Sequence, residues 1–230
     1  VIGFDLRVRG QLDIPSSSSS SRIQKKPPVL VSNHTTIYDG FALLAAAGPV
    51  SFVSRRTFFG TPFVGSVLTA LDAVGVDRRQ KDAARHAIED RLRDSSKRWP
   101  VCVFPEGATT NGLGVVEFRT GAFSSNATDD VAPVAIRFSA PSGFDLSYVS
   151  NQMTPWAVLR HGLRTLLEPG KVAEVTFLPV LSRRDAEDDH AYAERARDAI
   201  AAALGVPTWE GWNSTRMRLA WYDANAAKVD

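Results

Sequence analysis

Short apolar runs rich in β-branched residues alternate with longer helix-like stretches along most of this chain. The predicted strands are residues 29–32, 50–54, 73–76, 101–104, 131–138 and 173–178. The predicted helices are residues 40–47, 62–71, 81–99, 155–167 and 190–204. This alternation is typical of parallel sheets, because parallel neighbours need a long crossover that is usually helical. The expected fold class is α/β, with a mixed, largely parallel sheet flanked by helices.

At 230 residues, the chain is long enough for one domain of this class with a sizeable core. We therefore expect a single domain over residues 1–230. Six consecutive serines at 16–21 interrupt it, followed by a lysine and proline-rich stretch. Such a composition cannot bury a core, so residues 15–28 are expected to form a flexible loop. Because the chain begins with Val1 directly before an apolar segment, we also expect it to be a fragment of a longer protein.

Charge and cysteine content narrow the function classes. The formal net charge is only +2, from 27 basic and 25 acidic residues, so no strong overall field draws the chain to nucleic acid. The one cysteine, Cys102, excludes an internal disulfide, and its apolar surroundings predict burial. The histidines, cysteine and acidic residues do not cluster into a convincing metal site. No window approaches the roughly 18–20 apolar residues of a membrane span, and no signal peptide is visible.

The first chemical signal follows the strand at 29–32. His34 and Asp39 lie five residues apart directly after it, where a general base and its orienting carboxylate are commonly placed. On a regular helix these positions would lie about 140° apart and would not meet. The pair therefore works only if His34 sits in a turn and Asp39 folds back toward it. The alternative is a polar loop histidine followed by an ordinary acid at a helix start. None of His86, His161 and His190 has an aspartate at the same spacing.

Two further segments could bind an anion. After the strand at 101–104, a tight turn carries Glu106 and Gly107 and then the hydroxyls of Thr109 and Thr110. Glycine lets backbone N–H groups approach an anion, and the threonines add donors. The strand at 73–76 is followed by Arg78 and a second arginine, which suit a phosphate. The alternatives are a plain polar turn and a solvated basic corner.

The predicted helix at 155–167 is amphipathic. Its apolar side carries Trp156 and four leucines, with arginines and a histidine interspersed. Such a helix can lie on a membrane surface. Packing of its apolar side against the core is the interpretation that we favour from the sequence.

Taken in order, these segments resemble the glycerolipid acyltransferase family, whose members acylate lysophosphatidate and other lysophospholipids. The family's blocks N-H-x4-D, F-P-E-G and V-x-P-V correspond to residues 33–39, 104–107 and 131–134, and Gly75-Val76-Asp77-Arg78 is similar to its G-x-x-x-R-type block with one residue fewer. The F-P-E-G block lacks the arginine of the commonest F-P-E-G-T-R-S form. With F-R-T-G-A-F at 118–123, it is similar to the branch that acylates lysophosphatidylcholine and lysophosphatidylethanolamine.

The resemblance implies an acyl-CoA-dependent O-acyltransferase that acts on the free glycerol hydroxyl of a lysophospholipid. It implies His34 as the general base and Asp39 as the residue that holds the imidazole. It places the acceptor's headgroup near five residues: Arg78, Glu106, Gly107, Thr109 and Thr110. Glu106, which would repel phosphate when ionised, is expected to orient an arginine or a ligand hydroxyl. Acyl-CoA is then a co-substrate rather than a cofactor, and no metal is needed. The partners are acyl-CoA, a lysophospholipid and a membrane surface, with an endoplasmic-reticulum location.

Three alternatives stay open from the sequence. The acceptor can be lysophosphatidate. The chain can be a non-catalytic lipid-binding module of the same fold, although the intact His34 and Asp39 favour catalysis. The same base can also activate water, which would make the protein a thioesterase or lipase.

Overall fold

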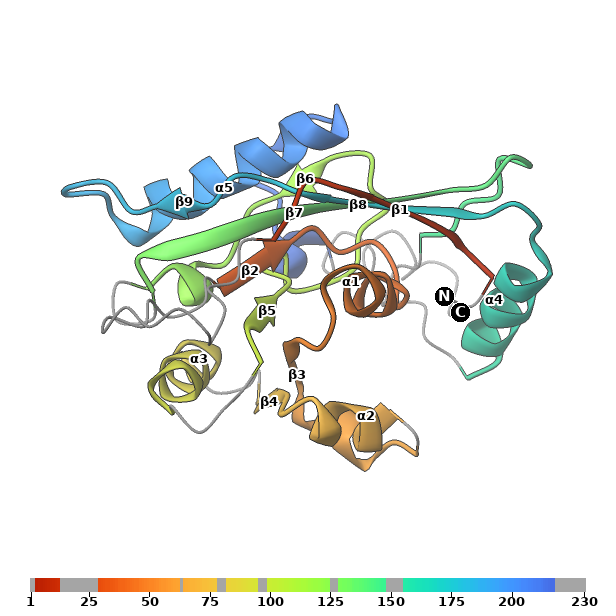
Figure 1. Ribbon diagram of the computed structural model, residues 1–230, viewed down its shortest axis with the longest axis horizontal. Helices are drawn as coiled ribbons and strands as arrows, with labels where there is room; N and C mark the ends of the chain where they lie inside the picture. Colours follow the sequence, from red (N-terminus) through yellow and green to blue (C-terminus); the bar gives the residue numbers. More distant parts are fainter. Residues whose placement is uncertain are drawn as a thin grey trace, which may run out of the picture.

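A mixed β-sheet runs through the middle of this computed structural model (Figure 1). The structure describes residues 3–12, 29–62, 64–77, 82–94, 99–124, 128–147 and 155–217. The predicted loop at 15–28 and Arg78 lie outside the described residues. The strands are β1 (Asp5–Arg9), β2 (Val29–Ser32), β3 (Ser51–Arg55), β4 (Val74–Val76), β5 (Val101–Val103), β6 (Val115–Val116), β7 (Asp130–Ser139), β8 (Val172–Phe177), β9 (Leu181–Ser182) and β10 (Thr208–Trp209).

The helices are α1 (Asp39–Ala47), α2 (Val64–Ala70), α3 (Ala83–Arg93), α4 (Pro155–Leu167) and α5 (Asp189–Leu204), with short 3-10 helices η1 (Arg56–Gly60) and η2 (Thr120–Phe123). The strand order is β1-β8-β7-β2-β5-β3-β4, with β9 beside β7, and β6 pairs with β10 separately. The pairs β1–β8, β7–β2, β2–β5, β5–β3 and β3–β4 are parallel, whereas β8 and β9 run antiparallel to β7. The predicted α/β class with a largely parallel, helix-flanked sheet is confirmed.

Side chains of the central strands alternate between two apolar layers. In β2, Val29 and Val31 pack in the layer that contains residues of α3 and α5, while Leu30 packs in the layer that contains residues of α1. Because β2 is covered on both faces, all four of its residues are buried. Cys102 of β5 is buried as predicted, and burial raises the pKa of its thiol.

The parallel register brings the loop that contains His34 and the turn that contains Glu106 to one edge of the sheet. Val31 of β2 pairs with Val103 of β5, so both strands end at the same level. The loop with His34 follows β2, and the turn with Glu106 follows β5. This is the carboxyl edge, where open parallel sheets commonly bind ligands.

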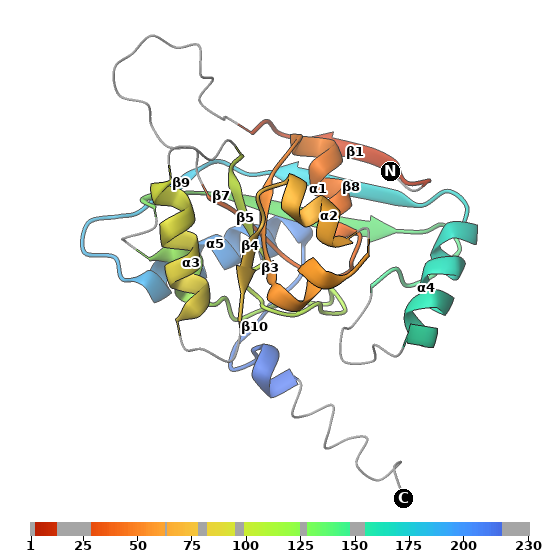
Figure 2. The ribbon, with the colours of Figure 1, turned by 90° about the horizontal axis from the view of Figure 1, so that it is seen from below.

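Helix α4 departs from the sequence prediction. It lies beyond one end of the sheet in both views, apart from the other helices (Figures 1 and 2). Trp156 is 70% exposed and Leu167 is 83% exposed. Leu159, Leu163 and Leu166 are exposed as well. The expectation that these side chains pack into the core is wrong, because amphipathicity shows that a helix has an apolar side without showing which way that side points.

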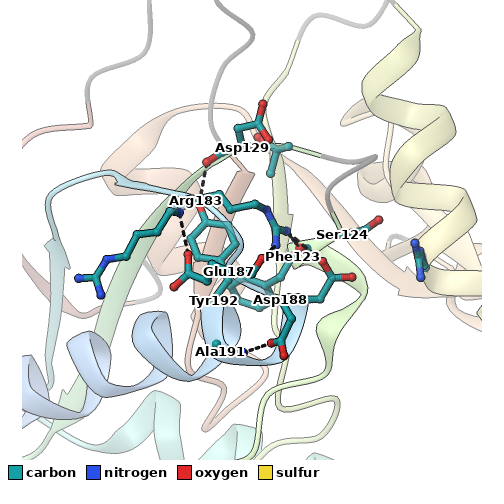
Figure 3. Close-up of polar contacts among 12 residues, drawn as sticks. Phe123, Ser124, Asp129, Arg183, Glu187, Asp188, Ala191 and Tyr192 are labelled. Atoms are coloured by element: carbon teal, nitrogen blue, oxygen red, sulfur yellow. Dashed lines mark hydrogen bonds and ion pairs between the residues drawn. The ribbon is translucent and has the colours of Figure 1, made fainter.

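A polar cluster ties the start of α5 to β9 and to the loop before β7 (Figure 3). Tyr192 is buried, and the guanidinium groups of Arg183 and Arg195 lie over its ring. Their Cζ atoms are 4.9 and 5.1 Å from the ring centroid. The Tyr192 hydroxyl lies 2.6 Å from the carbonyl oxygen of Leu181 and 3.0 Å from that of Asp129. We call this set of residues the Tyr192 cluster; it joins segments separated by about 60 residues of sequence.

Candidate active site

Asp39 folds back onto His34, as the sequence required. Oδ2 of Asp39 lies 2.6 Å from Nδ1 of His34. The same oxygen accepts hydrogen bonds from the backbone N–H groups of Thr35 and Thr36, at 2.7 and 2.9 Å. The spacing of five residues is accommodated because residues 34–38 lie outside regular secondary structure and α1 begins only at Asp39. The carboxylate is therefore held on three sides before any ligand binds.

This contact fixes which nitrogen of His34 can act as a base. A carboxylate accepts hydrogen bonds, so Nδ1 carries the ring proton and donates a hydrogen bond to Asp39. The lone pair is then on Nε2. The His34 side chain is 24% exposed while that of Asp39 is fully buried. An imidazole held in this tautomer, with its orienting carboxylate out of water, is equipped to remove a proton from a bound hydroxyl.

An aromatic wall fixes the plane of the His34 ring. The ring stacks on Phe104, with centroids 4.3 Å apart and an interplanar angle of 18°. Phe104 in turn stacks on Phe52 of β3 at 6.1 Å. Since one face of the imidazole is covered by Phe104, the ring cannot turn away from Asp39 without losing this contact.

Glu106 holds the backbone of the His34 turn. Its side chain is buried, and Oε1 accepts a hydrogen bond from the His34 N–H at 2.9 Å. Burial raises the pKa of this carboxyl to about 8, so it is largely protonated at neutral pH. The sequence did not predict this contact with the His34 backbone, which gives Glu106 a positioning role. A contact of Glu106 with a ligand or an arginine stays a prediction.

The residues after Glu106 also clasp the His34 turn. The backbone N–H of Thr110 donates to the carbonyl oxygen of His34 at 2.8 Å. Both Thr109 and Thr110 are buried. Gly107 has φ +73°, and a Cβ there would lie 2.7 Å from Nε of Arg119. The structure thus brings four of the predicted residues together: His34, Asp39, Glu106 and Thr110. Gly107 directly follows Glu106 in the same loop. Thr109 lies in the same loop, and the headgroup-binding roles stay predictions.

Arg119 is a candidate site residue that the sequence reasoning did not assign. Its side chain crosses over Gly107, and Nη2 donates to Oγ of Ser214 at 2.7 Å. Arg119 also lines a cavity of about 510 Å³ together with Glu117, Phe118 and residues 213–216. The sequence feature that could have indicated Arg119 is the F-R-T-G-A-F block, whose arginine follows the F-P-E-G turn in the chain. Only the fold shows that this arginine lies against that turn.

No group of three or more His, Cys, Asp or Glu side chains in the part of the chain that the structure describes is arranged to hold a metal ion. No helix in the ranges that the structure describes is long and apolar enough to cross a membrane.

The fold and the site define a class: an α/β protein with a histidine oriented by a carboxylate at the carboxyl edge of a largely parallel sheet. The family model named Acyltransferase matches residues 5–137. The chain belongs to the acyltransferase family, and the predicted family resemblance is confirmed.

Individual relatives agree with this assignment. Human lysophospholipid acyltransferase LPCAT4 is 32% identical over 91% of this chain and 38% of its own length. Lysophosphatidylcholine acyltransferase 2 of Mus musculus is 31% identical over 90% of this chain and 36% of its own length. Glycerol-3-phosphate acyltransferase 3 of Danio rerio is 30% identical over 81% of this chain and 41% of its own length. The chain therefore spans well under half the length of these relatives.

A solved structure has the same fold. The crystal structure of the 1-acyl-sn-glycerophosphate (LPA) acyltransferase PlsC from Thermotoga maritima superposes with a TM-score of 0.61, covering 89% of this chain and 72% of that one. The two sequences are only 17% identical, so the likeness concerns the fold.

Proposed function

We propose that this protein moves a fatty acyl group from acyl-CoA to the free glycerol hydroxyl of a lysophospholipid, with lysophosphatidylcholine or lysophosphatidylethanolamine as the favoured acceptor. The observation that carries the proposal is the 2.6 Å contact between Nδ1 of His34 and Oδ2 of Asp39. This contact leaves Nε2 as a base beside the carboxyl edge of the sheet.

In the proposed reaction, Nε2 of His34 takes the proton of the acceptor hydroxyl while its oxygen attacks the thioester carbonyl. The imidazolium that forms is stabilised by the Asp39 carboxylate. When the tetrahedral intermediate collapses, the C–S bond breaks and the imidazolium returns its proton to the departing CoA thiolate. The products are the acylated lipid and free CoA, and His34 is again neutral.

The acceptor's headgroup phosphate needs positive charge near the reacting hydroxyl. Arg119 lies against Gly107 and lines the adjacent cavity, which supports a role for it in holding that phosphate. Arg78 is proposed to assist, as the family resemblance implies. In this proposal the protein works at a membrane surface, in the endoplasmic reticulum, and needs no cofactor beyond acyl-CoA as co-substrate.

The names of the relatives support more than one acceptor. Two of them are named for lysophospholipid or lysophosphatidylcholine substrates, which favours the larger headgroups. One is named for glycerol 3-phosphate, and the structural neighbour for lysophosphatidate. A smaller acceptor with a phosphomonoester is therefore the second candidate. A panel of lysophospholipids, lysophosphatidate and glycerol 3-phosphate, assayed with several acyl-CoAs, decides between them by kcat/KM.

The decisive experiment is His34→Ala, followed as CoA release from acyl-CoA plus lysophosphatidylcholine. Loss of the general base should lower kcat by about 10²–10⁴-fold, with an unchanged circular dichroism spectrum. His86→Ala, at an exposed position of α3, is the matched control and should keep full activity. Turnover retained by His34→Ala would remove His34 from the chemistry.

The products of the same assay separate the alternatives. Acylated lipid indicates transfer, while free fatty acid indicates hydrolysis. Tight lysophospholipid binding without any thioester cleavage indicates a lipid-binding module.

A further inference from the structure

Helix α4 presents its apolar side to solvent. At about 100° per residue, Trp156, Leu163 and Leu167 fall on the middle of one arc, and all three are more than 50% exposed. Leu159 and Leu166 flank this arc on one side, at 50% and 58% exposure. The buried Thr165 falls on the opposite side of the helix. A contiguous exposed set of one tryptophan and four leucines on a single helix marks an interaction surface rather than scattered exposure.

The charges on α4 identify the kind of partner. Arg160 and Arg164 are exposed on the other border of the same arc. Residues 155–167 contain no Asp or Glu. A helix with a tryptophan and leucines on one side, bordered by arginines, suits a bilayer interface with anionic headgroups. Tryptophan is also the side chain that prefers this boundary, because its ring is apolar and its N–H needs a polar partner.

The inner side of α4 connects to the active-site loop. The ring of His161 stacks on Tyr38, with centroids 6.3 Å apart and an angle of 22°. Burial lowers the pKa of His161 and so disfavours its charged form. Tyr38 is the residue directly before Asp39, within the turn that holds His34. Arg164 also lies over the ring of Phe144, at 4.4 Å. Helix α4 therefore contacts the segment that carries His34 through the His161 ring.

The topology places α4 and His34 at the same edge of the sheet. Helix α4 lies in the connection from β7 to β8, and Ser139 at the end of β7 pairs with Val172 at the start of β8. Strand β2 runs parallel to β7, so its end points toward the same edge. Figure 2 shows α4 beyond this edge.

We propose that α4 docks through its exposed apolar side onto a lipid bilayer that carries anionic headgroups. Docking brings the His34 edge of the sheet to the membrane surface, where a lysophospholipid resides. The proposal deepens the proposed function and rests on it for its purpose, but docking itself requires neither acyl-CoA nor turnover.

A fluorescent probe at the centre of the surface tests this directly. Leu163→Cys can be labelled selectively with an NBD maleimide, since the native Cys102 is fully buried. With vesicles of phosphatidylcholine and phosphatidylserine, NBD emission at position 163 should shift to the blue and be quenched by doxyl groups on the lipid chains. The control is Ala203→Cys on the exposed side of α5, which should show neither change.

Two other outcomes overturn the proposal. If the probe at 163 is already blue-shifted without vesicles and insensitive to the lipid quencher, protein covers this surface, either a second copy or another segment. If the probe at 163 stays water-exposed with vesicles present, the surface does not bind lipid.

Substitutions then measure the contribution of the surface. Leu163→Gln with Leu167→Gln should weaken vesicle binding about a hundredfold, whereas Ala202→Gln with Ala203→Gln on α5 should not. Arg160→Gln should weaken binding about fivefold, and only to vesicles with phosphatidylserine. Equal vesicle binding by the leucine variant and the parent would contradict docking through α4.

Activity assays keep this proposal separate from the proposed function. The leucine variant should lose turnover of lysophospholipid embedded in vesicles and keep turnover of a short-chain lysophospholipid dispersed in solution. A parent protein that docks but releases no CoA would refute the proposed function alone. One that acylates the dispersed substrate without docking would refute α4 docking alone.

Discussion

The His34 loop and the Tyr192 cluster both place polar or charged groups around a ring side chain, but the two rings differ in exposure and in what they contact. In the active-site loop, a buried carboxylate orients an imidazole that stays partly exposed. In the Tyr192 cluster, two arginines cover an aromatic ring that is fully buried, and the Tyr192 hydroxyl meets two backbone carbonyl oxygens. The first cluster leaves the His34 side chain 24% exposed. The second uses its hydroxyl to join separate segments of the chain.

Polar contacts around an aromatic side chain therefore do not by themselves indicate that the side chain takes part in catalysis. What distinguishes the His34 cluster is a ring nitrogen, Nε2, that the contact with Asp39 does not use, on a side chain that is 24% exposed. Damage to it should therefore reduce turnover and leave stability nearly intact. Damage to the Tyr192 cluster should reduce stability and leave turnover nearly intact.

Among variants that keep the His34 ring, the largest expected effect is that of Asp39→Asn. The amide can no longer favour the tautomer with the proton on Nδ1 or stabilise the imidazolium, so kcat should fall by about three to four orders of magnitude. CoA release measures the effect, and a urea unfolding curve checks that the fold is kept. Asp90→Asn, on the exposed side of α3, is the matched control. A near-normal rate in Asp39→Asn would remove the difference between the two clusters.

The second effect concerns the pH dependence of stability through Glu106. Its carboxyl has a pKa of about 8 in the fold against an ordinary value of 4.5. The folded state therefore holds the proton more tightly than the unfolded state, and this stabilisation is full below pH 4.5 and is lost as the pH rises to about 8.

Glu106→Gln tests this, because glutamine keeps the acceptor for the His34 N–H and cannot ionise. Unfolding free energies measured in urea from pH 5 to about 9 should fall more steeply for the parent than for Glu106→Gln. Parallel curves for the two proteins would show that Glu106 is not protonated in the fold. Turnover by the variant should stay close to that of the parent at neutral pH, since its contact with His34 is retained.

The smallest effect is that of Tyr192→Phe. Removing the hydroxyl leaves the carbonyl oxygens of Leu181 and Asp129 without this donor, which should lower the free energy of unfolding by about 1–3 kcal/mol. Turnover per folded molecule should not change, because the cluster does not contact the His34 loop. Thermal or urea unfolding measures the loss, and a reduced kcat at unchanged folded fraction would contradict the separation of the two clusters.

Much of the fold followed from local pattern. The runs of β-branched residues predicted β2 and β4 to within a residue, and helix α4 has the predicted bounds. Strand β7 continues through Pro133, as the predicted strand at 131–138 does, and the Pro133 carbonyl oxygen accepts a hydrogen bond from the Leu178 N–H. Strands β6, β9 and β10 have two residues each, too few to show a periodic pattern.

The site was predictable where it depends on neighbours in sequence. The turn that brings Asp39 to His34 spans six residues, so its geometry could be reasoned from spacing. The contact of Glu106 with the His34 backbone could not, because it depends on the register of β2 with β5. The position of Arg119 over Gly107 could not be predicted either, because it depends on how the chain after β5 returns to place the Arg119 N–H against the carbonyl oxygen of Pro105. The outward direction of the α4 leucines depends on which side of the helix the sheet occupies.

The pairing of β1 with β8 has a consequence for how the chain folds. Asp5 pairs with Val172, so one outer strand finds its partner only after most of the described chain has been made. At about 5–20 residues per second of synthesis, β1 waits on the order of ten to thirty seconds with its backbone unpaired. Contacts of such long sequence separation also form slowly in a complete chain. We expect the central strands β2, β5 and β3 to assemble first, and β1 to join the sheet late.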